Sequence, residues 1–588
     1  MPPDRCPTRG ADGRADGVTR MTIQGVLQLV ILMLVIGLLA KPIGTYMYRV
    51  FHGERTFLDF ALVPLERLSY RIAGVDHTKE MRWTTYGLAL LAFNLAGFAV
   101  LFVLLLLQQV LPLNPAHFHA PSFWVAWNTA VSFTTNTNWQ TYGGESTLSY
   151  LSQMWLIVQQ FVSPVTGICF FLAVVRGFVR HNAETLGNFW HDFVRGLLWI
   201  AVPGAIVGAV LLMALGSPQN FNAYTVVHTL QGSTQTIAQG PIASMTSIMQ
   251  LGDNGGGYMN TNGAHPYEAP NAASLVLQLL LGFLIPVGCI YLFGMMVKDR
   301  RQGWAIFAAM ALMFVPLTLI MYHAEAVGNP LLAPLHLSST VNMEGKETRF
   351  GAALSTLFNS GTTAVSWGSV SAMNDSMTPI GGLIPLFNMM TGEVIFGSWG
   401  VGMVGMLAYA VMAVFLAGLM VGRTPEYLGK KIQGFEIKMA VLAMVVPSFV
   451  ILIFSAISVV IKPGLAGIAN PGPHGLSEVL YAFSSGVGNN GSAFGGLNSA
   501  LPWYALTVGL AMLFGRYAMY LPMLGMAGAL VKKQRIPVSA GTFPTHGWLF
   551  VVLLVGTVLI IGALTFFPAL ALGPFAEQFS MQAGKVFG

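Results

Sequence analysis

The sequence predicts an all-α membrane protein that crosses the bilayer about ten times. Hydrophobic residues make up 54% of the chain, charged residues only 9%, and the mean hydropathy is +0.64. Soluble globular proteins carry about 25% charged residues, so this composition excludes an ordinary soluble domain. A polar, glycine-rich pattern also recurs at near-regular intervals, which indicates four similar modules within the one chain.

Runs of about 20 mostly apolar residues locate the expected spanning helices. They lie near residues 23–47, 84–111, 148–175, 193–216, 273–297, 304–323, 386–421, 439–461, 503–531 and 548–570. Residues 1–20 are polar and lack the apolar centre of a signal peptide. We expect them to be a disordered tail or the product of an upstream start codon, with Met21 as the true start.

Lysine and arginine orient these helices. They concentrate in the connecting segments 49–82, 176–195, 298–301, 423–438 and 532–535. The loops and the C-terminal tail on the other side have only Lys346, Arg349, Lys462 and Lys585, although the four arginines of residues 1–20 would lie there too. The positive-inside rule therefore predicts that the basic segments are cytoplasmic and that both termini lie outside.

Four polar segments recur on the predicted outer side, at residues 132–144, 250–263, 359–371 and 484–496. Marked by Asn138, Gly255, Gly368 and Gly491, they are spaced by 117, 113 and 123 residues. Each follows a short helix-compatible run, at 123–133, 240–250, 350–361 and 476–486. Such runs are too short to span and are typical of re-entrant segments.

The chain thus resolves into four pore modules with one extra helix at each end. The modules are expected at residues 84–176, 193–297, 303–421 and 438–531. The remainder comprises the tail 1–20, the N-terminal helix 21–50, a cytoplasmic loop 51–83 and the C-terminal helix and tail 546–588.

The repeated turn predicts a cation site. Non-helical backbone at membrane depth is tolerated only where protein or a water-filled path satisfies it, and selectivity filters are rings of backbone carbonyls. Glycine lets a carbonyl point inward at positive φ, and short helices ending at such a ring direct their negative dipole ends at it. The residues placed for this role are Gly255, Gly256, Gly257, Gly368, Gly488 and Gly491, with Asn136, Thr137 and Asn138 in the first copy. The alternative is that these turns are ordinary loops; four of them at near-equal spacing favour the ring.

Several long strings resemble one family. They are TTNTNWQ at 134–140, GDNGGGYMNTNGAHPYE at 252–268, GGLIPLFNMMTGEVIFG at 381–397, GRTPEYLGKKI at 422–432 and GNNGSAFGG at 488–496. They are similar to those of the channel-like A subunit of the bacterial Kdp potassium-transporting ATPase, from about Met21 to the C-terminus. The resemblance implies the fold of the potassium-transporter superfamily, in the bacterial inner membrane.

The resemblance also implies a function. It implies that the chain binds external K⁺ as its transported substrate, uses no organic cofactor, contacts no nucleic acid, and passes the ion through a tunnel to a P-type ATPase B subunit. The C subunit and a small F subunit would complete the complex. The candidate K⁺-filter residues are then Thr137, Asn138, Gln140, Asn254, Gly255, Gly256, Trp367, Gly368, Asn490 and Gly491.

Ionisable residues inside spanning segments are rare and often functional. Arg516 lies within the ninth predicted span and Glu393 early in the seventh, which is rich in glycine and is expected to be broken or hinged. We hypothesise that Arg516 hinders straight passage of a cation and that Glu393 faces a polar cavity. The alternatives are a structural ion pair or a snorkelling arginine. Arg423 is a gate candidate too, although a cytoplasmic anchor is the simpler interpretation.

The remaining motifs give weaker evidence of function. His117 and His119 form a conceivable metal pair, but two histidines without a nearby carboxylate or thiolate are typical of a surface. The chain has no GxxxxGK[ST] loop and no DKTG signature, so we expect a non-catalytic transport subunit whose energy comes from a partner. The alternative is a self-sufficient K⁺ channel or symporter of the same superfamily.

Overall fold

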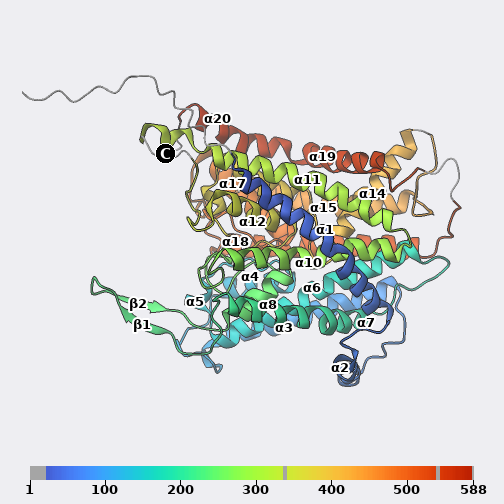
Figure 1. Cartoon of the computed structure of the whole chain (residues 1–588), viewed down its shortest axis with the longest axis horizontal. Coiled ribbons are helices and arrows are strands. Elements are labelled where there is room, and N and C mark those ends of the chain that lie inside the picture. Colours follow the sequence, from blue (N-terminus) through green and yellow to red (C-terminus); the bar gives the residue numbers. More distant parts are fainter. Residues whose placement is uncertain (1–20, 336–340, 421, 538–542, 586–588) are drawn as a thin grey trace, which may run out of the picture.

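The computed structural model describes residues 21–335, 341–420, 422–537 and 543–585, so the expectation for residues 1–20 lies outside the described part. Within these ranges, ten helices are long and apolar enough to cross a membrane. They are α1 (Ile23–His52), α3 (Trp83–Leu106), α6 (Tyr150–Val179), the run of α7 (Phe189–Arg195), a π-helical turn (Gly196–Ala201) and α8 (Val202–Ala214), α10 (Ala272–Met296), α11 (Arg300–Val327), α14 (Val401–Met420), α15 (Gly434–Ser458), α18 (Pro502–Leu530) and α19 (Trp548–Leu570). The long helices run roughly side by side in one bundle (Figure 1), which confirms the predicted fold class.

Four short helices match the predicted re-entrant runs. They are α4 (Phe123–Thr134), α9 (Ile242–Leu251), α12 (Gly351–Ala364) and α17 (Gly472–Gly488). Each contacts the long or broken helices that precede and follow it: α4 lies between α3 and α6, α9 between α8 and α10, α12 between α11 and α13 (Pro379–Met390), and α17 between α15 and α18. This packing fits the expected modules.

The predicted span 386–421 is not one continuous helix, because α13 and α14 are separated by residues 391–400. Gly392, Glu393 and Gly400 have φ values of 84°, 51° and 83°, which a right-handed helix excludes. The expected break is therefore confirmed. Glu393 lies in that break rather than in a helix.

Smaller elements connect the bundle. An exposed antiparallel hairpin of β1 (Thr225–His228) and β2 (Thr234–Ile237) projects from one end (Figure 1). At the other end, α2 (Asp59–Ala73) forms within the segment that the sequence suggested was a loop. The remaining elements are α5 (Gly144–Thr147), β3 (Glu426–Tyr427), β4 (Lys430–Lys431), α16 (Lys462–Leu465), α20 (Ala576–Gln582), a π-helical turn (Ala571–Phe575) and 3₁₀ turns at Gln108–Val110, Pro330–Leu335 and Asn374–Ser376.

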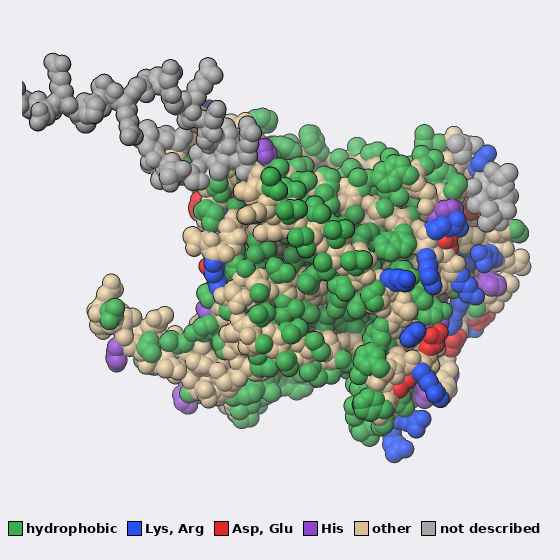
Figure 2. Space-filling view, viewed as in Figure 1, with side chains coloured by type: hydrophobic (Ala, Val, Ile, Leu, Met, Phe, Trp, Pro, Cys, Tyr) green, Lys and Arg blue, Asp and Glu red, His purple; other side chains and the backbone are tan. Residues whose placement is uncertain are grey.

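Charge separates the two ends of the bundle. On the face shown in Figure 2, Lys and Arg side chains gather at the end of α2 and α7, while hydrophobic side chains cover the middle. Leu38, Leu88 and Leu564, on the spanning helices α1, α3 and α19, are among the exposed apolar residues. An apolar belt between two polar ends is the surface that a bilayer requires.

The extra N-terminal helix is held by close backbone contact. α1 packs along α10, and Gly44 of α1 lies where an added methyl carbon would come within 2.7 Å of the Gly288 carbonyl oxygen. Gly37, on the same helix, has only a Phe307 ring atom near such a carbon, at 3.9 Å.

This difference predicts opposite effects of one substitution. Gly37→Ala should raise the melting temperature slightly, since alanine is a better helix former by about 1 kcal/mol. Gly44→Ala should lower it, because overpacking costs about 1–3 kcal/mol. Thermal unfolding of both variants in detergent checks the pair, and equal shifts would contradict the close packing of α1 on α10.

Candidate functional site

The four polar turns share one backbone conformation. In each, two residues separated by one position adopt positive φ: Asn136 and Asn138 (69° and 53°), Asp253 and Gly255 (50° and 69°), Ser366 and Gly368 (63° and 78°), and Asn489 and Gly491 (58° and 91°). The second members are the four residues that mark the repeat in the sequence. Asn138 takes the place of glycine in the first turn, and asparagine is among the residues that tolerate this conformation best.

The residue between each pair is fixed to its short helix by one repeated hydrogen bond. Its N–H donates to the carbonyl group five residues earlier: Thr137 to Ser132 (2.9 Å), Asn254 to Met249 (3.1 Å), Trp367 to Thr362 (2.9 Å) and Asn490 to Ser485 (2.9 Å). Each turn therefore begins directly at the C-terminal end of α4, α9, α12 or α17. Four negative dipole ends are thus placed at the turns.

The turns meet at one place. A methyl carbon built on Gly255 would lie 2.6 Å from the carbonyl oxygen of Asn490, 2.7 Å from that of Trp367 and 3.1 Å from that of Thr137. One built on Gly368 would overlap the Asn490 carbonyl, and one on Gly491 the Thr137 carbonyl. Carbonyl oxygens from the first, third and fourth turns thus crowd against the backbone of the second turn at Gly255, and only glycine leaves room for them. We call Thr137, Gly255, Trp367, Gly368, Asn490 and Gly491 the carbonyl ring.

The other predicted filter residues lie beside this ring. The Asn138 carbonyl oxygen is 2.7 Å from a methyl carbon built on Gly256, and the Gln140 side-chain amide donates to the Gly257 carbonyl at 2.7 Å. The side chains of Asn254 and Asn136 approach to 2.6 Å. The Trp367 indole instead packs on Phe358 and Gly282 in the core, so only its backbone belongs to the ring. The structure thus brings all ten predicted filter residues together.

A second set of residues interlocks the turns, and sequence reasoning missed most of it. The first positive-φ side chain in a turn reaches the next turn: Asn136 Nδ2 donates to the Asp253 carbonyl (2.8 Å), Ser366 Oγ to the Gly488 carbonyl (3.2 Å) and Asn489 Nδ2 to Thr137 Oγ1 (3.0 Å). The sequence signal was an Asn, Asp or Ser two positions before each repeat mark.

Asp253 breaks this pattern. It is fully buried, and neither carboxyl oxygen has a hydrogen-bond partner among the described residues. A carboxylate cannot donate to a neighbouring carbonyl, so the link from the second turn to the third is the one that is missing.

A cavity of about 90 Å³ lies next to the third and fourth turns. Its lining includes Ser366 and Asn489 together with the charged residues Glu393 and Arg516. The Glu393 carboxyl carbon is 2.8 Å from a methyl carbon built on Gly488, directly before the fourth turn. Burial in a bundle interior makes these two charges costly, which is typical of a functional role.

Arg516 is held from two sides. Its Nη2 donates to the Ser163 carbonyl (3.3 Å), and its guanidinium carbon lies 4.7 Å from the Tyr520 ring centroid. Ser163 Oγ in turn donates to Asn136 Oδ1 (2.6 Å), which connects this residue to the first turn. Arg516 and Glu393 form no ion pair with each other in the described part of the chain, so the arginine presents its charge to the cavity.

Arg423 lies elsewhere. It is exposed beyond the end of α14 and does not line the cavity. The same motif supplies Lys430, whose Nζ donates to the carbonyl groups of Gly177 (2.8 Å), Leu530 (2.6 Å) and Arg180. Burial lowers the pKa of Lys430 to about 8. The motif therefore ties the ends of α6 and α18 together.

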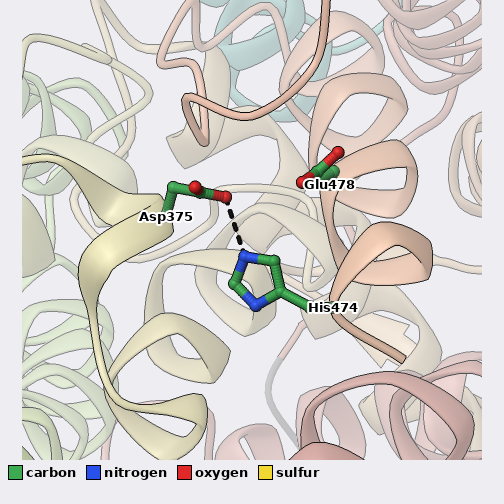
Figure 3. A group of neighbouring side chains, drawn as sticks. All are labelled: Asp375, His474 and Glu478. Carbon is green, nitrogen blue, oxygen red and sulfur yellow. Dashed lines mark hydrogen bonds and ion pairs between the residues drawn. The ribbon is translucent and has the colours of Figure 1, made fainter. Parts of the chain in front are cut away.

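One acidic cluster has the composition of a metal site (Figure 3). Ligand atoms of Asp375, His474 and Glu478 lie within 4.8 Å of one another. However, His474 Nε2 bonds to Asp375 (2.8 Å) and its Nδ1 to Glu577 (2.7 Å), so neither ring nitrogen has a lone pair free for a metal. Burial alone would lower the pKa of His474, but these bonds raise it to about 10. The cluster is a charged clamp between α17 and α20. The other candidate pair, His117 and His119, is exposed as expected.

The missing interlock predicts the effect of a conservative change. Asp253→Asn replaces a buried, unpartnered carboxyl by an amide that can donate to the third turn, as Asn136 does to the second. An unsatisfied buried polar group costs on the order of 1–3 kcal/mol, so the melting temperature in detergent should rise. The control Asn136→Asp removes a donor that is in use and should lower it. A lower melting temperature for Asp253→Asn would contradict the interlock.

Comparison with known proteins places the chain in one family. The family described as potassium-transporting ATPase A subunit matches residues 30–579. The potassium-transporting ATPase potassium-binding subunit of Rhodospirillum centenum is 53% identical over 570 residues, covering 97% of this chain and 100% of that protein. The subunit of the same name from Brucella anthropi is 54% identical over 568 residues, covering 96% and 100%.

Among solved structures, the potassium transporter TrkH from Vibrio parahaemolyticus has a TM-score of 0.49 and 14% identity, covering 85% of this chain and 98% of that one. The family match and the two relatives extend over nearly all of the chain, including the four turns and the cavity. The chain belongs to the family of potassium-transporting ATPase A subunits.

Proposed function

We propose that this chain is the K⁺-binding and translocating subunit of an ATP-driven K⁺ uptake complex in the bacterial inner membrane. The observation that carries the proposal is the convergence of four turns on the carbonyl ring. Backbone carbonyls can replace the hydration shell of a monovalent cation. Two relatives with more than half of their residues in common are named potassium-binding subunits, which supports K⁺ as the ion.

The ten filter residues have different roles in ion binding. The carbonyl groups of the ring coordinate the ion, and glycine at positive φ lets the turns approach each other. Asn138 and Gly256 extend the ring, Asn254 is fixed by Asn136, and the Gln140 amide holds the Gly257 carbonyl. The ring takes up K⁺ from the extracytoplasmic side. The gathering of Lys and Arg at the opposite end of the bundle supports this orientation.

Below the ring, the cavity with Glu393 and Arg516 receives the ion. Arg516 opposes straight passage to the cytoplasm because its charge is buried and faces this cavity. Glu393 offers a compensating carboxylate close to the fourth turn. Deflected by the arginine, the ion leaves sideways through the bundle toward a P-type ATPase B subunit.

ATP hydrolysis belongs to that partner, because this chain has no phosphate-binding loop and no aspartyl-phosphate motif. C and F subunits complete the complex, and Arg423 at the basic end is a candidate contact for them or an anchor. The experiment that separates this proposal from a self-sufficient channel is reconstitution in vesicles. K⁺ flux through the purified chain alone, at the rate of the whole complex, would overturn the subunit proposal.

The ring makes a direct prediction for Gly255. Gly255→Asp places a side chain where the Asn490, Trp367 and Thr137 carbonyl groups already crowd, so K⁺ affinity should fall by at least about tenfold, a loss of about 1.4 kcal/mol. Gly232→Asp is the control, since Gly232 also has positive φ (83°) but has no atom within 4 Å of the added carbon. Equilibrium K⁺ binding measures both variants. Unchanged affinity in Gly255→Asp would contradict the proposed filter.

Arg516 gives a second prediction. Arg516→Gln keeps a hydrogen-bond donor but removes the charge, so cations should leak through the chain and uptake should need more ATP per ion. Arg55→Gln, at an exposed arginine outside the cavity, serves as the control and should keep tight coupling. The ratio of K⁺ transported to ATP hydrolysed is the readout. The same ratio in Arg516→Gln and wild type would remove Arg516 from the proposed route.

A further inference from the structure

The segment after the second turn is longer than its counterparts. It runs from Gly257 to the start of α10 at Ala272, whereas α13 and α18 begin sooner after Gly368 and Gly491. Buried polar groups fix its base: the Glu268 carboxyl accepts the Tyr258 N–H (2.6 Å), and Gln278 Nε2 donates to the Glu268 carbonyl (2.7 Å). The segment is therefore a built part of the structure rather than a loose connection.

Its middle is attached to the third turn. The Asn262 carbonyl oxygen accepts the Val370 N–H (3.0 Å) and the Ser369 hydroxyl (3.2 Å). Asn262 and Gly263 both have positive φ, at 53° and 96°. Both contacts use the backbone carbonyl of Asn262 and leave its side chain free to make other hydrogen bonds.

That side chain reaches two members of the carbonyl ring. Asn262 Nδ2 donates to the Gly368 carbonyl at 2.8 Å and lies 3.4 Å from the Gly491 carbonyl. Asn262 is only partly buried, whereas all members of the ring are buried, so this contact lies toward the solvent side of the ring. One neutral amide thus presents N–H groups to oxygens contributed by two different turns.

We propose that the Asn262 amide is a tethered substitute for a cation at the outer end of the carbonyl ring, which an entering ion must displace. The positive end of an N–H dipole satisfies carbonyl oxygens in the empty ring. An ion that coordinates the same oxygens competes with it. Asn262 thereby sets the affinity of the outermost position, an inference that rests on the proposed K⁺-binding function.

Two variants test the competition in the full-length chain in detergent, with K⁺ itself as the probe. Asn262→Gly removes the amide and suits the positive φ, while the backbone contacts to the third turn remain. One lost competing hydrogen bond should tighten apparent K⁺ binding about fivefold. Asn262→Asp replaces the donor by an acceptor with a negative charge, and should bind K⁺ more tightly still. Asn260→Ala, at an exposed position of the same segment, should bind as wild type does.

The K⁺ dependence of thermal unfolding separates competition with the ion from a merely structural role. Without K⁺, Asn262→Gly should melt below wild type; in saturating K⁺, the two melting temperatures should coincide because the ion satisfies the ring in both. Equal or weaker K⁺ affinity in both Asn262 variants would overturn the inference, as would a melting difference that persists in saturating K⁺. If wild type itself binds no K⁺, the proposed function fails rather than this inference alone.

Discussion

The arrangement depends on the space at Gly255. Three carbonyl oxygens from other turns lie so close to this residue that no side chain fits. The constraint acts on all four modules at once, because displacement of one turn would open the contact with the others. Positive φ at two positions per turn places these oxygens, and a short helix ending at each turn holds them. The convergence of four turns that are far apart in the sequence thus depends on one local backbone conformation that is repeated four times.

A polar interior inside an apolar belt has a cost, which hydrogen bonding offsets. Asn136, Ser366 and Asn489 each connect one turn to the next, and Ser163 connects the first turn to Arg516. These bonds satisfy groups that water cannot reach in the bundle. The same network gives a physical route by which the cavity with Arg516 and the ring can influence each other. Asp253 is the point where the network is incomplete.

Much of this could be predicted from the sequence. Composition and apolar runs gave ten spans, and the positions chosen to mark the repeat are the second positive-φ residues of the four turns. Periodicity succeeded because each module repeats the same local chemistry. The break at Glu393 was expected from its glycines, but its limits were not, since they depend on tertiary contacts such as that of the carboxyl with Gly488.

Other features could not be read from the chain. The interlocking side chains join residues more than a hundred positions apart, and the reach of Asn262 to Gly368 and Gly491 depends on how a long segment folds back. The helix α2 was missed because its mixed polar and apolar sequence does not form the long apolar run that marks a spanning helix. The His474 cluster appears only when α17, α20 and the segment after the third turn come together.

The central claim is that a cation is bound by the backbone carbonyl groups of four convergent turns. Anomalous diffraction from crystals soaked in thallium(I), a heavy substitute for K⁺, tests it most directly. The account predicts an anomalous peak within the ring, next to the carbonyl oxygens of Thr137, Trp367 and Asn490 and removed by excess K⁺. Ordered turns with no peak in the ring, or a K⁺-displaceable peak only at a site that these oxygens do not line, would contradict it.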